Sequence, residues 1–135
     1  MRVLIVGNDL RTRILVKALI SGRHKVVLVS DDQPFCESMA NQTEHQVVQG
    51  DASHPDVLAA ACAEQSDLLI AMLSSDADNL VICEMAKRKF GVQRTIAMVE
   101  NPVNRIVFMR LGVDSVICAA EACSQLVENA IGAVS

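Results

Sequence analysis

Short, unbroken runs of aliphatic residues recur along this chain and alternate with segments long enough to form a helix. The clearest runs cover residues 3–6, 26–29 and 68–72, and shorter ones cover 46–49, 95–99 and 115–118. Continuous apolar runs are typical of parallel strands that are buried on both faces. Because crossovers between parallel strands are right-handed, the order predicts an α/β fold: a Rossmann-like, doubly wound, parallel six-stranded sheet with helices on both faces.

Glycines and capping residues mark where the helices end and begin. A glycine follows a helical pattern and precedes a strand at Gly22, Gly91 and Gly112, the position of a C-terminal stop. Ser53 and Ser75 each open a Ser-x-x-acid capping pattern, and Asn101 precedes a proline. We therefore expect helices over 76–90 and 102–111 and a final helix near 121–131. The whole chain, 1–135, is predicted to be one domain whose last helix is a crossover or interface helix.

The composition excludes several classes of function. The net charge of −4, the absence of Trp and Tyr and the presence of only three Phe leave neither a basic footprint nor a supply of stacking rings, so no nucleic-acid partner is expected. No run approaches the ~20 apolar residues that cross a bilayer, so we expect no membrane insertion and a cytoplasmic protein. Five cysteines without C-x-x-C spacing indicate reduced thiols, and no metal site is expected.

A sheet of this kind places its ligand beyond the carboxyl ends of the strands, where the strand order reverses. Five loops should meet there, namely 7–12, 30–32, 50–53, 73–76 and 100–101. In the first loop only Gly7 remains of a G-x-G-x-x-G dinucleotide fingerprint. Asp9 replaces the second glycine and puts a carboxylate where a phosphate would lie, although Arg11 and Arg13 could offset its charge. The loop either binds pyrophosphate or is a simple strand-to-helix turn with Asp9 as its N-cap.

The next two loops leave similar alternatives. The acid that normally binds the ribose hydroxyls is replaced by Ser30, with Asp31 and Asp32 just beyond it. These acids either preserve the hydrogen bonds to the ribose or cap the following helix. Asp51 either accepts a hydrogen bond from an adenine amino group or stabilises its own turn.

Catalytic groups are scarce. His24, His45 and His54 stand in no recognisable relation to a nucleophile, and no paired acids appear. No second domain is present to bring a substrate against a nicotinamide ring. The chain is therefore predicted not to be an enzyme, with a small NAD(P)-dependent oxidoreductase domain as the alternative.

The two helices predicted over 76–90 and 102–111 are apolar nearly all round. A crossover helix needs only one buried stripe, so their second apolar side predicts a subunit interface. A thick monomer core is the alternative interpretation.

Several segments, in order, carry a family resemblance. They are VLIVG at 3–7, HKVVLV at 24–29, VQGDASHPDVL at 48–58, DLLIA at 67–71 with Asp76 and Asn79 downstream, and Arg105-Ile106 with LGVDSVI at 111–117. With them the chain resembles the N-terminal Rossmann lobe of the RCK domain (regulator of K⁺ conductance), also called the KTN or TrkA-N domain, over nearly its whole length.

The resemblance implies a cytosolic, ligand-sensing regulatory domain of a membrane potassium channel or transporter, located at the inner face of the cell membrane through its pore partner. Such domains form homodimers or higher rings through the helices that 76–90 and 102–111 match. The implied ligand is an adenine nucleotide: NAD, NADH, ATP, ADP or AMP. A ligand-free assembly module of the same fold is a further alternative.

The resemblance also implies roles for the loop residues. Asn8, Asp9 and Leu10 would face phosphates, Ser30 and Asp31 the ribose, Asp51 and Ala52 the adenine, and Leu73, Ser74 and Glu100 the remaining wall. With Gly7 and Arg11 these are the candidate cofactor-binding residues.

The departures from the family pattern are informative. The missing glycines resemble the branch found in ligand-gated potassium channels. Some of that branch bind calcium through acids after strands four and five, but Met72 and Met98 stand at two of those positions and leave Glu100 alone. That calcium site is therefore not expected. The family's C-terminal lobe is absent, which indicates either a fragment or a subunit that works with another chain.

Overall fold

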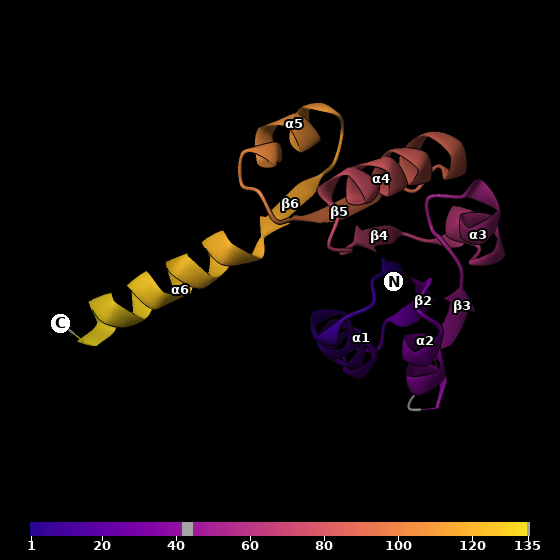
Figure 1. Ribbon diagram of the computed structural model, residues 1–135, viewed down its shortest axis with the longest axis horizontal. Helices are drawn as coiled ribbons and strands as arrows, with labels where there is room; N and C mark the ends of the chain where they lie inside the picture. Colours follow the sequence, from indigo (N-terminus) through magenta and orange to yellow (C-terminus); the bar gives the residue numbers. More distant parts are fainter. Residues whose placement is uncertain (42–44, 135) are drawn as a thin grey trace.

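The computed structural model describes residues 1–41 and 45–134, with the side chain of residue 134 left out. The elements follow one another as β1 (Arg2–Val6), α1 (Leu10–Ser21), β2 (Lys25–Ser30), α2 (Gln33–Ala40), β3 (Gln46–Gln49), α3 (Pro55–Ala60), a 3₁₀ turn η1 (Ala63–Gln65), β4 (Leu68–Ala71), α4 (Asp76–Phe90), β5 (Arg94–Val99), α5 (Asn104–Arg110), β6 (Ser115–Cys118) and α6 (Ala119–Val134). Figure 1 shows their arrangement.

The six strands form one parallel sheet in the order β3-β2-β1-β4-β5-β6. The predicted doubly wound parallel sheet is confirmed. The order reverses between β1 and β4, so the loops after β1 and β4 diverge to opposite faces there.

Two separate cores cover the two faces of the sheet. On β1, Leu4 and Val6 belong to the core shared with α3, α4 and α5, whereas Val3 and Ile5 belong to the core shared with α1 and α2. This follows from the alternation of side chains along a strand. Figure 1 shows α1 and α2 on one side of the sheet and α3, α4 and α5 on the other. Both faces of the strands are therefore buried, which is why their sequences are continuously apolar.

Helix α4 has the bounds that the sequence predicts. The Ser75 side chain accepts the backbone N–H of Asp78 at 3.2 Å and caps the first turn. Gly91 ends the helix in the left-handed conformation, at φ 68°, which glycine adopts without steric cost.

Two predicted caps are wrong. Ser53 does not cap α3, whose N-cap is His54; the Ser53 hydroxyl instead donates to Asp51 at 2.7 Å. Asn101 does not cap α5, which begins at Asn104 rather than at 102; the Asn101 side chain accepts the N–H of Val103 at 3.0 Å and closes a turn before the helix. In both cases the side chain forms a hydrogen bond within the turn before the helix instead of capping the helix.

The last helix is longer than predicted and leaves the body of the molecule. It covers Ala119–Val134 instead of 121–131, and its described side chains beyond Ala119 are exposed. Figure 1 shows it extending away from the sheet. Arg105 of α5 fixes its base by donating to the Val116 carbonyl and to the Glu121 carboxylate. Within the described part of the chain every helix is too short or too polar to span a lipid bilayer.

Candidate functional site

The first loop of the site is built around a glycine that admits no side chain. A Cβ on Gly7 would lie 2.2 Å from Oγ1 of Thr12 and 3.0 Å from Cγ of Met72, so only glycine allows α1 to start this close to the strand. Asp9 is the N-cap of α1: its Oδ1 accepts both the N–H and the hydroxyl of Thr12 at 3.0 Å. Asp9 therefore does cap α1, which was one of the two alternatives that the sequence allowed for this residue.

Arg11 links this loop to the loop after β5. Its guanidinium lies 3.2 Å from Oδ2 of Asp9 and 3.6 Å from Oε1 of Glu100. Burial alone would raise the pKa of Asp9, but the hydrogen bonds from Thr12 and the adjacent charge of Arg11 outweigh it and hold that pKa below its usual value. Asp9 is thus ionised at neutral pH, and the offset of its charge by Arg11 has a direct geometric basis.

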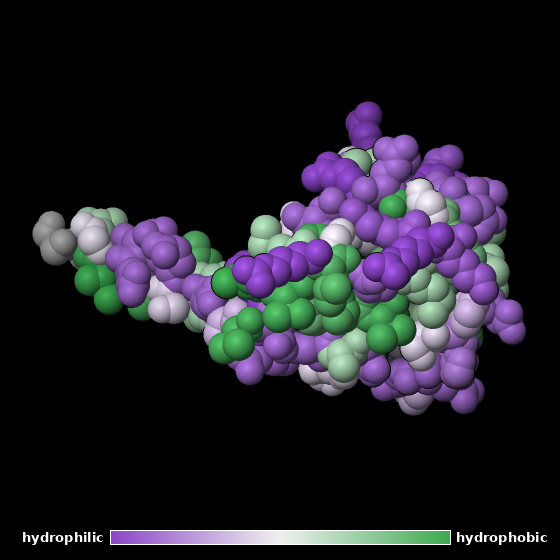
Figure 2. Space-filling view, turned by 90° about the horizontal axis from the view of Figure 1, so that it is seen from above, coloured by the Kyte–Doolittle hydropathy of each residue, from purple (hydrophilic) through white to green (hydrophobic). Residues whose placement is uncertain are grey.

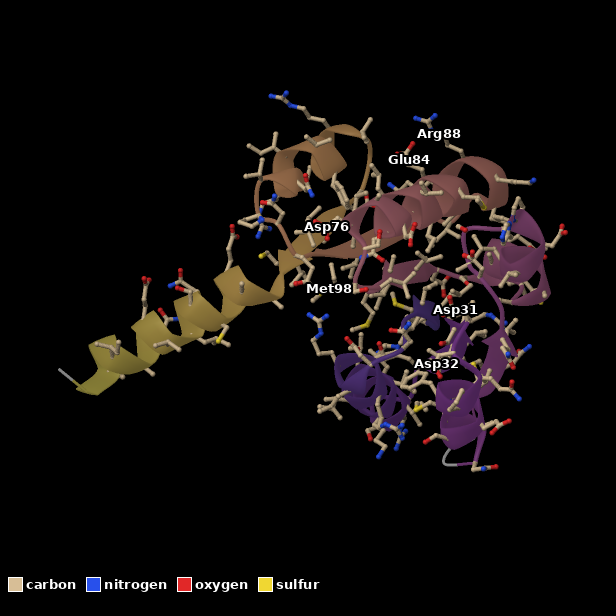
Figure 3. The ribbon with its side chains drawn as sticks, in the orientation of Figure 1. Asp31, Asp32, Asp76, Glu84, Arg88 and Met98 are labelled. Carbon is tan, nitrogen blue, oxygen red and sulfur yellow. The ribbon has the colours of Figure 1, made fainter. Side chains whose placement is uncertain are left out.

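The loop after β2 divides its three polar residues between different tasks. Ser30 is buried, and its hydroxyl accepts the N–H of Asp32 at 3.1 Å. Asp32 caps α2 by accepting the N–H of Phe35 at 2.9 Å. Asp31 is exposed and lies beside them, as Figure 3 shows. One acid therefore serves the helix, which leaves the carboxylate of Asp31 at the rim of the site.

A shallow hollow at the carboxyl ends of the strands brings several predicted residues together. It is lined by Val6, Ser30, Asp31, Gly50, Asp51, Ala52 and Leu73. Five of these, Ser30, Asp31, Asp51, Ala52 and Leu73, are candidate cofactor-binding residues, and they come from the ends of three strands, β2, β3 and β4. We call this hollow, together with the adjoining Asp9–Arg11–Glu100 ion pairs, the crevice. Asn8, Leu10 and Ser74 are exposed and do not line the hollow.

Asp51 is held mainly by its own turn. Its Oδ1 accepts the Ser53 hydroxyl at 2.7 Å and the Ser53 N–H at 2.9 Å, and Oδ2 lies 3.5 Å from Nε2 of His54. The side-chain and backbone hydrogen bonds of Ser53 lower its pKa. The turn-stabilising role is therefore present, and Oδ2 remains the oxygen that faces solvent and His54.

Two residues that the sequence pointed to only as part of the family resemblance, Asn79 and Asp76, hold the crevice loops in place. Asn79 of α4 is fully buried, accepts the N–H of Leu73 at 2.9 Å and donates to the carbonyls of Leu73 and Met98, each at 2.9 Å. It therefore fixes the loop after β4 against β5. The chain position of Asn79, in the second turn of a helix after a strand, carries no signal of these contacts.

Asp76 holds the loop after β5. Its Oδ1 accepts the N–H of Glu100 at 2.7 Å, and its Oδ2 accepts the N–H of Asn101 at 3.2 Å and the side-chain amide of Asn104 at 2.8 Å. Burial would raise the pKa of Asp76, but these three hydrogen bonds outweigh it and lower the pKa. Figure 3 shows Asp76 and Met98 near the base of α6.

Metal ligands are not assembled here. No group of three or more His, Cys, Asp or Glu in residues 1–41 and 45–134 could hold a metal ion. Met72 is buried beside Gly7, and Glu100 is committed to Arg11. The expectation that the family's calcium site is absent stays a prediction.

The comparisons with known proteins identify the family of the chain. The model of the TrkA-N domain matches residues 3–119. The chain belongs to the TrkA-N domain family. The resemblance noted from the sequence is thereby confirmed, and the match ends at the first residue of α6.

Relatives in this family share about three residues in ten with the chain. The Trk system potassium uptake protein TrkA of Haemophilus influenzae is 32% identical over 101 residues, which are 75% of this chain and 22% of that protein. The TrkA homolog of Methanothermobacter thermautotrophicus is 28% identical over 131 residues, which are 97% of this chain and 60% of that protein. The chain thus spans less than two thirds of either relative.

Solved structures show the same fold. The TrkA-N domain of the inner membrane protein ybaL from Escherichia coli superimposes with a TM-score of 0.88 at 16% identity and covers 95% of this chain and 94% of that one. The GsuK channel bound to NAD is 30% identical with a TM-score of 0.76 over 86% of this chain and 21% of that one. GsuK has also been solved bound to ADP.

Proposed function

We propose that this TrkA-N domain is a regulatory module of a potassium channel or transporter that binds an adenine nucleotide in the crevice and acts on the cytoplasmic side of the membrane. The observation that carries the proposal is the crevice itself: the end of β1 and the loops after β2, β3 and β4 line one hollow, and the similar GsuK channel has been solved bound to NAD and to ADP. The named relatives are potassium uptake proteins, which supports potassium flux as the regulated process.

In this proposal, each part of the nucleotide is assigned to named residues of the crevice. The Asp31 carboxylate at the rim is free to accept the ribose hydroxyls, because Asp32 already caps α2. Asp51 and Ala52 stand on the adenine side, and Gly50 keeps that side close to α3, where a Cβ would meet Cγ2 of Val57 at 2.8 Å. Gly7, Asn8, Leu10, Leu73, Ser74 and Glu100 complete the proposed wall.

The phosphates would meet Asp9 and Arg11 together. The N-terminus of α1 favours an anion, and the Asp9 carboxylate opposes it. We infer that a bound phosphate would draw the Arg11 guanidinium away from Asp9 and Glu100. Ligand binding would then loosen the loop after β5, which Asp76 connects to α4 and α5.

Exposed apolar side chains support a homodimer or a higher ring. Five of them surround the short helix α5, namely Val103, Ile106, Val107, Met109 and Leu111. We call this set the α5 patch, and Figure 2, which looks onto α4 and α5, shows a continuous apolar area there, next to the base of α6. Only Phe108 of this helix is buried in the core, at 3% exposure. We propose that residues 1–135 form a single domain and that two subunits meet through α4 and α5, the helices that the sequence predicts over 76–90 and 102–111. The α5 patch is then covered by the second subunit, and α6 crosses to it.

A regulatory role without catalysis is part of the proposal. The three histidines lie outside the lining of the crevice hollow, and His24 and His45 lie at the opposite end of the sheet. A small nicotinamide-dependent oxidoreductase would need a side chain that transfers a proton to or from the substrate beside the nicotinamide ring. No histidine lies among the described lining residues of the hollow to take that role.

The experiment is a thermal-melting series with NAD, NADH, ATP, ADP and AMP on the purified chain. A nucleotide that binds the folded state raises the melting temperature, and the rise grows with the logarithm of the ratio of its concentration to its dissociation constant. Asp31→Asn should abolish most of that rise, whereas Asp32→Asn should keep it, because asparagine also caps helices and the charge change is the same. If no nucleotide raises the melting temperature, the ligand-free assembly module is the correct alternative.

A further inference from the structure

A second cavity lies at the opposite edge of the sheet from the crevice. It has a volume of about 450 Å³, which is within the range of small-molecule sites. It is formed where β1, β2 and β3 begin, and its charged or titratable lining consists of Arg2, Arg23, His24, Lys25 and His45. We call it the amino-end cavity. Because all strands are parallel, this cavity is separated from the crevice by the length of the sheet.

Among residues 1–41 and 45–134, the charged side chains that line the amino-end cavity have one sign of charge. Arg2, Arg23 and Lys25 are cations at neutral pH, and no Asp or Glu is among the described residues that line it. The nearby Asp67 accepts the backbone N–H of Arg2 at 2.8 Å, not its guanidinium. None of these three cationic side chains forms an ion pair within the described residues.

Some cations elsewhere among the described residues are paired with carboxylates. Arg11, Lys87, Arg88 and Arg105 each contact a carboxylate. Figure 3 shows such a pair, Glu84 and Arg88, on the outer side of α4. In a chain of net charge −4, three cations that form no ion pair among the described residues gather around one cavity, and together they form a local positive field that attracts an anion.

The end of α1 does not account for these cations. Basic side chains near a helix C-terminus often satisfy its last carbonyls. Here backbone groups do so: Gly22 donates to Ala18 at 3.0 Å, Arg23 to Ile20 at 2.9 Å and His24 to Leu19 at 3.0 Å. The guanidinium of Arg23 is therefore not needed to cap the helix.

Arg23 also has a left-handed backbone conformation, which glycine adopts more readily than arginine. Its φ is 65°, in the left-handed region, while the glycine before it has φ −77°. A residue with a Cβ is sterically disfavoured in that conformation. Beside it, Nδ1 of His24 is buried and has no hydrogen-bond partner among the described residues. A strained cation and an unsatisfied ring nitrogen thus border the same cavity.

From these observations we propose that the amino-end cavity is a binding site for a phosphate-bearing anion, held by Arg2, Arg23 and Lys25 with a hydrogen bond from His24. Guanidinium groups suit this ligand because two parallel N–H groups match two phosphate oxygens. The site is independent of the nucleotide crevice. A soluble phosphate ester and a phospholipid headgroup share this chemistry, and the experiment separates them.

The test follows the backbone amides of the ¹⁵N-labelled chain by NMR during a titration with sodium pyrophosphate, against sodium chloride at equal ionic strength. Saturable shifts should appear at residues 23–25 and 45–46. Arg23→Gly removes the guanidinium and relieves the left-handed strain, so the variant should fold, melt at a higher temperature and bind pyrophosphate at least fivefold more weakly. Arg94→Gln is the matched control, because Arg94 opens β5 at the same edge but does not line the cavity.

A second arm measures cosedimentation with vesicles of phosphatidylcholine alone or mixed with phosphatidic acid. Saturable pyrophosphate shifts that depend on Arg23 support a soluble phosphate ester. Cosedimentation with the mixed vesicles alone, lost in Arg23→Gly and kept in Arg94→Gln, supports a headgroup. The proposal is overturned if neither probe binds, if the shifts lie only at residues 7–12, or if both variants weaken binding equally.

Discussion

The carboxylate of Asp76 accepts the backbone N–H of Glu100 at 2.7 Å and so ties the first turn of α4 to the loop after β5. The same carboxylate also holds the side chain of Asn104, in the first turn of α5. One residue therefore connects the wall of the crevice, through Glu100, with the helix that carries the α5 patch. This is a direct physical route by which a ligand could influence a neighbouring subunit.

The first prediction concerns the stability supplied by Asp76. Asp76→Asn replaces one acceptor oxygen with a donor that faces other N–H donors, so the free energy of unfolding should fall by about 1–3 kcal/mol. Urea unfolding measures it. Asp78→Asn is the matched control, because Asp78 lies in the same first turn and shares the helix-dipole effect, which is about 0.3–1 kcal/mol. Equal losses in both variants would show that the dipole, and not the loop contacts, is responsible.

The second prediction is the pH dependence of that contribution. The pKa of Asp76 is lower in the folded chain than its ordinary value, so its ionised form is favoured by folding. The stabilisation is then fully present above the unfolded pKa and is lost as the pH falls through the folded pKa. The difference in unfolding free energy between the wild type and Asp76→Asn should be constant from pH 7 to pH 5 and shrink below about pH 4.

Other carboxylates titrate in the same range, which is why the difference between the two proteins is the quantity to measure. The pKa values of Asp9, Asp51 and Asp114 are also lowered, and they affect both proteins alike. A difference that stays constant down to pH 3 would contradict the assigned hydrogen bonds.

The sequence predicts the sheet and α4 well because their signals are local. Continuous apolar runs identify buried strands, and Ser75 and Gly91 act on the residues next to them. The same reasoning fails for Asp76, whose partners lie 24, 25 and 28 residues further along the chain. It also fails at Ser53, because the helix begins one residue later, with His54 as its N-cap, and the Ser53 hydroxyl donates to Asp51 in the preceding turn.

In the crevice, too, some features are predictable from the sequence and others are not. Its loops are predictable from strand order, since the carboxyl ends of parallel strands share one edge. The Arg11–Glu100 contact at 3.6 Å is not, because it joins two loops that are distant in sequence. The sequence of α6 likewise does not predict the direction in which this helix extends away from the sheet.

The third prediction tests the role of Asp9 in nucleotide binding and rests on the proposed function. Asp9→Ser keeps a good N-cap for α1 but removes the charge that faces the phosphates. Affinity for the bound nucleotide should rise about tenfold, which corresponds to about 1.4 kcal/mol. Isothermal titration calorimetry measures it. Asp32→Ser is the control, because it also exchanges an N-cap acid but acts on α2, away from the phosphates.

Arg11→Gln should act in the opposite direction and weaken the nucleotide by a similar factor. If Asp9→Ser leaves the affinity unchanged while Asp31→Asn still lowers it, the nucleotide binds without placing its phosphates at the start of α1.

The fourth prediction concerns the α5 patch. Ile106 is 60% exposed on α5 and Ile14 is 59% exposed on α1, so the two residues match in size and accessibility. Burial of an aliphatic side chain in a subunit interface contributes about 1.5–3 kcal/mol, and a buried carboxylate adds a large desolvation penalty. Ile106→Asp should therefore convert the dimer to a monomer in sedimentation-velocity ultracentrifugation, whereas Ile14→Asp should leave it intact.

The cysteines give this prediction an independent readout. Burial raises the pKa of the Cys83 thiol to about 12, so it should resist alkylation at pH 8 until the chain unfolds. Cys123 is exposed on α6. If α6 crosses onto a second subunit, Cys123 should react slowly in the wild type and in Ile14→Asp, and faster in Ile106→Asp. Equal Cys123 rates in all three proteins would exclude α6 from the interface, and a wild type that sediments as a monomer would remove the dimer altogether.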